Sequence, residues 1–117
     1  MSATNITTNP FPLGKISPGG SYATTSVPIT TNYSDLSTQY CYSLSIRALP
    51  GNGTGLIYIC NTSAAPDTTN YTNILDVLAA GAVSYVTSPA MDMILLGNYY
   101  IGASDGSSAA IVQVEFR

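Results

Sequence analysis

Histidine and tryptophan are absent from this chain of 117 residues, and only two of its residues are cysteine. Without histidine no Ser-His-Asp or Cys-His arrangement can form, because the imidazole is the base in both. A structural zinc site needs four nitrogen or sulfur ligands, which two cysteines cannot supply within one chain. The six acidic residues show no spacing that favours a glycosidase pair. We therefore expect no enzyme activity, no cofactor and no metal site.

Charged side chains are also scarce: they make up 8% of the chain, with three cations, six acids and a net charge of −3. A nucleic-acid site needs several cations facing phosphates, and the three here are scattered, so we expect no nucleic-acid partner. The polar surface must come mainly from Ser, Thr and Asn, whose side chains lose water at a lower cost than ions do. Such a surface favours a domain that packs against other macromolecules. The alternative is an ordinary hydrophilic surface without a partner.

Long apolar runs are missing as well, since none approaches the ~20 residues that a membrane-spanning helix needs. Residues 1–10 carry neither the basic segment nor the apolar segment of a secretory signal. We expect no membrane association. Either the protein is made and used inside the cell, or a signal has already been removed, and Met1 favours the first alternative.

Short apolar stretches do recur along the chain, separated by turns rich in Gly, Pro, Asn and Ser at roughly 10-residue spacing. This pattern predicts an all-β, single-domain β-sandwich or jelly roll of seven to eight short antiparallel strands over residues 21–117. Residues 1–20 are rich in Thr, Asn, Pro and Gly, and we expect them to form an extended N-terminal arm. Phe11 and Leu13 are candidate anchors of that arm on a partner.

Residues 40–49 give the clearest strand signal, and residues 55–60 give the next one. The Pro and Gly residues between them predict a β-hairpin. With a two-residue loop, Cys41 would lie directly opposite Cys60 and a disulfide could form, whereas a five-residue loop would break this alignment. The lack of an export signal favours reduced thiols. A mixed state, with one cysteine bonded to a partner chain, is the third possibility.

The predicted register of this hairpin leaves Leu56 and Tyr58 on its outer face, where they would be exposed unless something covers them. Residues 98–103 and 110–116 predict a last hairpin around a turn at residues 104–107.

Nine tyrosines supply most of the aromatic side chains, and tyrosine is common at protein interfaces. We expect Tyr40, Tyr42 and Tyr85 in the core. Tyrosines near loops or strand ends are candidate contacts, although ordinary cross-strand packing explains them equally well. The candidate partner-interface residues are Phe11, Leu13, Leu56, Tyr58, Tyr99 and Tyr100.

The stretch from Gly53 to Phe116 carries a family resemblance. It begins Gly-Thr-Gly-Leu-Ile-Tyr-Ile-Cys-Asn-Thr, continues with Asp-Val-Leu-Ala-Ala-Gly-Ala-Val-Ser-Tyr-Val and closes with Asn-Tyr-Tyr-Ile-Gly-Ala-Ser-Asp-Gly-Ser-Ser-Ala-Ala-Ile-Val-Gln-Val. This texture of apolar strands and Gly/Ser/Thr turns resembles the small structural proteins of tailed-bacteriophage virions, above all the capsid decoration or cement proteins. It covers about half of the chain and transfers no individual residue role.

The resemblance implies a protein of the virion surface, assembled in the host cytoplasm, that bridges neighbouring capsomers. Its partners would be the major capsid protein and neighbouring copies of itself, and it would form a homo-oligomer. The competing hypothesis is a receptor- or glycan-binding module of a phage tail fibre or an adhesin, with Tyr99, Tyr100 and Asp105 as its sugar platform.

Overall fold

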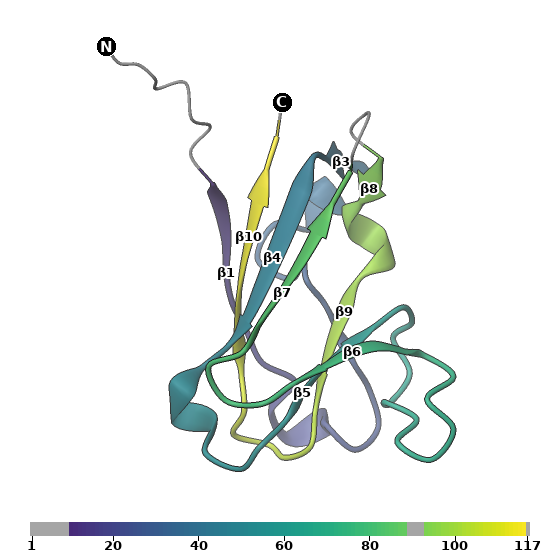
Figure 1. Ribbon diagram of the computed structural model, residues 1–117. Helices are drawn as coiled ribbons and strands as arrows, with labels where there is room; N and C mark the ends of the chain where they lie inside the picture. Colours follow the sequence, from purple (N-terminus) through teal and green to yellow (C-terminus); the bar gives the residue numbers. More distant parts are fainter. Residues whose placement is uncertain (1–9, 89–92, 117) are drawn as a thin grey trace.

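Alternation of apolar and polar side chains divides strand β4 (Ser43–Ala48) into a buried face and an open face. Leu44, Ile46 and Ala48 are at most 1% exposed, whereas the alternate residues point outward. A strand with one apolar face must cover that face with a second layer. The computed structural model, which describes residues 10–88 and 93–116, shows this layer as a second sheet (Figure 1).

The two layers are four-stranded, antiparallel sheets. The first sheet has the order β1 (Phe11–Ile16), β10 (Ala110–Glu115), β4 and β7 (Val83–Thr87). The second sheet has the order β2 (Val27–Pro28), β9 (Tyr100–Ala103), β5 (Ile57–Cys60) and β6 (Ile74–Leu78). The strands β3 (Tyr40–Cys41) and β8 (Ile94–Leu95) form a separate pair. Short 3-10 turns are η2 (Gly19–Ser21), η3 (Ser34–Thr38), η4 (Pro50–Asn52) and η5 (Leu96–Asn98).

The strands pair from the two ends of the domain inward. β1 pairs with β10, β2 with β9, β4 with β7, and β5 with β6. Two further pairings, of β10 with β4 and of β9 with β5, complete the two sheets. This is one long antiparallel hairpin rolled into two layers, the arrangement of an eight-stranded jelly roll. The predicted all-β sandwich is therefore confirmed, with jelly-roll topology.

Side chains from the inner faces of both sheets, together with Ile29, Cys41 and Leu96 from outside these sheets, fill the space between the layers. The largest of these are essentially inaccessible to solvent and contain no polar atom apart from one thiol. They are Leu13, Ile16, Ile29, Cys41, Leu44, Ile46, Ile57, Ile59, Leu96, Ile101, Val112 and Val114.

Both predicted hairpins are wrong. β4 and β5 lie in different sheets, as do β9 and β10, so each connection crosses from one layer to the other. All four residues of β5 are buried, which is typical of a strand covered on both faces.

The side-chain amide of Asn52 holds the connection between β4 and β5 in place. Its Nδ2 donates to Ala109 O (2.9 Å) and its Oδ1 accepts from Ala109 N–H (3.0 Å).

The predicted N-terminal arm also needs correction. β1 is an edge strand of the first sheet, and its Leu13 is fully buried. Pro12 is tolerated because an edge strand can do without one ladder hydrogen bond. A register shift between Pro12 and Gly14, which has φ +91°, adapts the strand to its neighbour. The remainder of the predicted arm, residues 1–9, lies outside the described residues.

Two of the three tyrosines predicted in the core are instead exposed. Tyr40 is 50% exposed and Tyr85 is 72% exposed, whereas Tyr42 is half-buried. The alternation predicted for residues 40–48 shifts at the bend between β3 and β4, so Cys41 takes the inward position instead of its neighbours. Tyr85 lies opposite Ser45 on the outer side of the first sheet.

The polar loop of residues 61–73 covers the outer face of the second sheet. A Cβ atom added to Gly102 would collide with the ring of Pro66, so the loop lies directly on β9. Ser26 holds the loop in place: its N–H donates to Ser63 O (2.9 Å) and its hydroxyl donates to Ala64 O (2.9 Å). This cover explains why the outward side chain of Tyr58 is only 7% exposed.

Asp67 and Asn73 hold the loop together from within. Asp67 Oδ1 accepts from the N–H groups of Thr69 (3.1 Å) and Asn70 (3.0 Å), and Oδ2 accepts from the Thr72 hydroxyl (2.7 Å). Chiefly the Asn70 N–H, and then the Thr72 hydroxyl, lower the pKa of this carboxyl below its ordinary value of 3.8. Asn73 Nδ2 donates to the carbonyl of Ala65 at 3.0 Å. The loop is therefore built around side-chain caps.

The core predicts a contrast between two neighbouring positions of β4. Ile46→Ala removes three buried methyl or methylene groups and should lower the free energy of unfolding by about 2–5 kcal/mol. Ser45→Ala, on the open face, should change it by less than about 0.5 kcal/mol. Urea denaturation of both variants measures this difference. Equal effects would contradict the assignment of the two faces.

The charge of Asp67 predicts a pH-dependent contribution to stability. Because the pKa of this carboxyl is lower in the folded chain than in the unfolded chain, its contribution is present above 3.8 and is lost as the pH falls through the folded value. The melting temperature of the wild type should exceed that of Asp67→Asn at neutral pH. Thermal melts in acid should show this difference shrinking. A difference that is independent of pH would contradict the charged role of Asp67.

Candidate functional site

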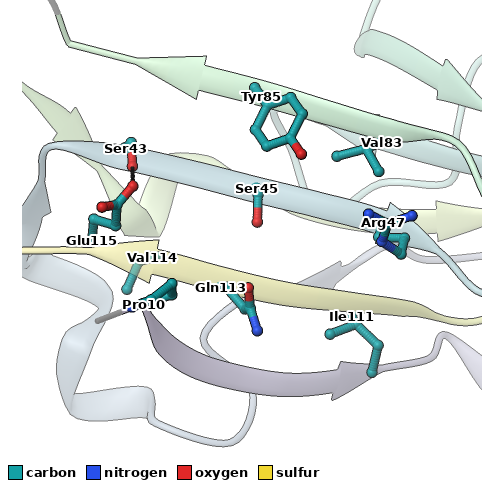
Figure 2. A pocket seen from close by; sticks show the side chains of 10 residues that line it. All are labelled: Pro10, Ser43, Ser45, Arg47, Val83, Tyr85, Ile111, Gln113, Val114 and Glu115. Carbon is teal, nitrogen blue, oxygen red and sulfur yellow. Dashed lines mark hydrogen bonds between the residues drawn. The ribbon is translucent and has the colours of Figure 1, made fainter. Parts of the chain in front are cut away.

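The outer face of the first sheet carries a shallow trough of about 240 Å³. Unlike the second sheet, whose outer face the loop 61–73 covers, this face is open in the part of the chain that the structure describes. Figure 2 shows its lining side chains rising from three strands, β7, β4 and β10, with Pro10 beside them. The lining residues are Pro10, Ser43, Ser45, Arg47, Val83, Tyr85, Ile111, Gln113, Val114 and Glu115.

The strand register produces the hollow. Ser45 lies directly between Tyr85 of β7 and Gln113 of β10. Neighbouring strands are about 4.8 Å apart, so a small side chain between two large ones leaves an open space above it. Ser43, two residues earlier on β4, is equally small and lies beside Glu115 of β10. The two serines of the central strand therefore form the floor of the trough.

Two ionised side chains mark opposite ends of the trough. At one end the Ser43 hydroxyl donates to Glu115 Oε1 over 2.7 Å (Figure 2). At the other end Arg47 lies between Val83 and Ile111, and its Nη1 donates to Gly81 O at 3.4 Å. One cation and one anion leave the lining with no net charge.

The middle of the trough holds polar groups that the protein itself does not use. Within residues 10–88 and 93–116, no hydrogen-bond partner is found for the Ser45 hydroxyl, the Gln113 amide or the Tyr85 hydroxyl. The guanidinium of Arg47 has five N–H donors, of which the bond to Gly81 engages one. These groups can therefore bind a polar ligand without breaking internal bonds.

A second surface feature is a group of apolar side chains at one end of the sandwich, which we call the aromatic end. Figure 1 shows that β1 begins, β10 ends, and β3 and β8 lie at this same end. The Phe11 ring packs edge-on against Tyr33 and against Phe116, with centroid distances of 5.2 Å and 6.0 Å. The aromatic end comprises Phe11, Tyr33, Tyr40, Met93 and Phe116.

Four of the five side chains of the aromatic end are exposed, and Phe116 is half-buried. Phe11 and Tyr33 are each 38% exposed, and Met93 is 67% exposed. Tyr40 pairs with Leu95, the strand position two residues after Met93. Exposed aromatic and methionine side chains of this kind are enriched in the parts of protein surfaces that contact partners.

The six residues predicted to contact partners fall into three groups. Phe11 lies at the aromatic end, where it stays a candidate. Leu13 is fully buried in the core and Tyr58 is buried under the loop 61–73, so both are removed as contacts. The remaining residues are half-buried: Leu56, Tyr99 and Tyr100.

Packing within the sandwich accounts for the half-buried tyrosines. Tyr99 packs against the core, and burial raises the pKa of its hydroxyl. Tyr100 and Asp105 lie towards opposite ends of β9, roughly 16 Å apart along an extended chain. Asp105 Oδ1 accepts from the N–H groups of Ser107 (3.0 Å) and Ser108 (2.8 Å), closing a turn. The predicted sugar platform of Tyr99, Tyr100 and Asp105 is therefore not assembled.

Cys41 and Cys60 are both buried and are not joined by a disulfide. The register that would place them opposite each other is wrong, because Cys41 pairs with Ile94, and Cys60 pairs with Ile74 and Tyr100. The pKa of the Cys60 thiol is raised, chiefly by burial. Because the thiolate is the reactive form, this raised pKa makes Cys60 less reactive.

Among the described residues, no three His, Cys, Asp or Glu side chains lie close enough to hold a metal ion. None of the helices in the described part of the chain is long and apolar enough to cross a membrane.

Sequence reasoning missed the trough. Ser45, Arg47 and Gln113 were identifiable as outward residues of their strands, but only the pairing of β7, β4 and β10 brings them together. The exposed Tyr85 was assigned to the core. A small residue at the centre of an alternating strand is the one local signal of a hollow.

Comparisons with models of protein families, with curated protein sequences and with solved structures found no match for this chain. The trough and the aromatic end are therefore the features that bear on function.

Burial of both thiols predicts slow reaction with a thiol reagent. In native protein, Cys41 and Cys60 should react with Ellman's reagent far more slowly than a free thiol, and both should react at once in denaturant. Adding a reductant should leave the melting temperature unchanged, because there is no disulfide to break. A melting temperature that falls with reductant would contradict the absence of a disulfide.

Proposed function

We propose that this chain is a non-enzymatic virion structural protein, a capsid decoration or cement protein that docks on the outer capsid surface through its aromatic end. In this role it bridges neighbouring capsomers and stabilises the shell. Its partners are the major capsid protein and neighbouring copies of itself, and its location is the capsid surface of the virion.

The observation that carries this proposal is the exposed aromatic end. Aromatic side chains bury about 150–250 Å² each when covered, and a few such residues commonly dominate an interface. Phe11 packs against both Tyr33 and Phe116, so the three rings present a prearranged cluster instead of three separate side chains. A partner that covers them gains apolar burial without first ordering them.

The low charge of the chain supports the same role. Only 8% of the residues are charged, so a copy can lie beside other copies with little repulsion and little cost of desolvating ions. An individual contact of modest size is then sufficient, because a symmetric shell engages many contacts at once.

The fold supports the proposal at the level of architecture. Jelly rolls are common in viral capsid proteins, and they also occur in lectins and cupins. Because one fold hosts many functions, the argument for docking depends on the aromatic end and not on the topology.

Co-sedimentation with empty shells tests the proposal. The shells are assembled from the major capsid protein encoded in the same genome, and the wild-type chain should sediment with them. A double variant, Phe11→Ser with Tyr33→Ser, should bind about tenfold more weakly or worse, since losing two interface aromatics costs at least about 1.4 kcal/mol. Circular dichroism verifies that the variant is folded.

Leu75→Ser is the matched control, because Leu75 is 54% exposed on β6, in the other sheet. It should bind shells like the wild type. A wild-type chain that stays in the supernatant would contradict the proposed function. An equal loss in the control would contradict the aromatic end as the docking surface.

A further inference from the structure

The trough on the first sheet shares no residue with the aromatic end, although Pro10 and Glu115 at its edge adjoin Phe11 and Phe116 in the chain. Its centre combines an aromatic ring that is 72% exposed with hydrogen-bonding groups that have no partner among the described residues. A large residue directly opposite an aromatic side chain on the next strand packs against it. Here the cross-strand neighbour of Tyr85 is Ser45, which leaves one side of the ring facing the hollow.

We infer that this trough is a binding site for a neutral saccharide. A pyranose ring has an apolar face of C–H groups and a rim of hydroxyls. Its apolar face matches the exposed ring of Tyr85, because the aromatic face is electron-rich and attracts polarised C–H groups. The hydroxyl rim matches Ser45 and Gln113, which offer both donors and acceptors on the floor.

The arrangement in Figure 2 supports this class of ligand. The side chain of Tyr85 comes from β7, that of Ser45 from β4, and those of Gln113 and Ile111 from β10, with Pro10 beside the same strand. Binding sites for small molecules combine apolar walls with a few convergent polar groups in this way. The site is also carried by three paired strands instead of loops, which fixes the positions of these side chains.

Charge favours a neutral ligand over an anionic one. The lining contains one cation, Arg47, and one anion, Glu115, at opposite ends. A phosphate or sulfate group would gain from Arg47 alone, because the lining contains no second cation to neutralise it, and Glu115 adds a negative charge. The Arg47 guanidinium is better suited to donating hydrogen bonds to adjacent hydroxyls of a neutral ligand.

The volume limits the size of the ligand. A hollow of about 240 Å³ lies below the usual range of about 300–1,000 Å³ for sites that enclose a drug-sized ligand. The trough therefore takes a single sugar ring at its centre, and further rings of a longer glycan would continue along the open face. Affinity for one ring should be weak, with dissociation in the millimolar range.

An array of neutral and acidic glycans, followed by NMR titration with the best neutral binder, tests this inference. Glucose, galactose, mannose and N-acetylglucosamine serve as the single-ring probes. Amide shifts should concentrate at Ser45, Tyr85 and Gln113. Tyr85→Ala should weaken binding about tenfold or more, whereas Tyr85→Phe should retain most of it because the ring is preserved.

Tyr40→Ala is the matched control, since it removes a half-exposed tyrosine from the aromatic end. It should leave saccharide binding unchanged, and Tyr85→Ala should leave co-sedimentation with shells unchanged. No binding to any neutral glycan, binding only to acidic glycans, or binding that survives Tyr85→Ala would each overturn the inference. Shifts at the trough that depend on protein concentration without sugar would overturn it in favour of a second copy of the chain.

Discussion

The antiparallel pairing of β1 with β10 is the constraint on which the rest of the structure depends. It joins residues 11–16 to residues 110–115, and every later pairing continues the same long hairpin towards its tip. It also leaves β10 between β1 and β4, in the interior of the first sheet. The inner face of that sheet then meets the second sheet and closes the core, while its outer face receives Gln113 next to Ser45. The same strand pairing therefore forms the core on the inner face of the first sheet and the trough on its outer face.

Much of the fold could be predicted from local patterns. The alternation along residues 43–48 correctly identified which side chains are buried, and the spacing of the turns correctly indicated an all-β sandwich. The partners of the strands could not be predicted in the same way, because a strand forms equally good hydrogen bonds with any neighbour of suitable length. Residues 57–60 show the limit: their continuous apolar run is compatible with a hairpin or with a central strand, and only the fold decides.

The surfaces were less predictable than the fold. Phe11 could be identified as a candidate contact because an aromatic side chain near a proline-rich end of the domain has few local partners. Leu13, two residues later, looked equivalent but is fully buried in the core, whereas Phe11 lies at the end of the strand. Tyr85 was misassigned because alternation alone cannot tell which face of an edge strand meets the core. A site that spans three strands has no signature within any one of them.

The position of β10 has a consequence for synthesis of the protein on the ribosome. Because β10 follows both of its partners in the sequence, β1 and β4 lack their common neighbour until translation has passed residue 115. Two unpaired strand edges with apolar inner faces are then exposed together, which is the condition under which nascent chains aggregate or recruit chaperones. Slow synthesis of β10 would thus promote aggregation of this domain more than slow synthesis of its first half.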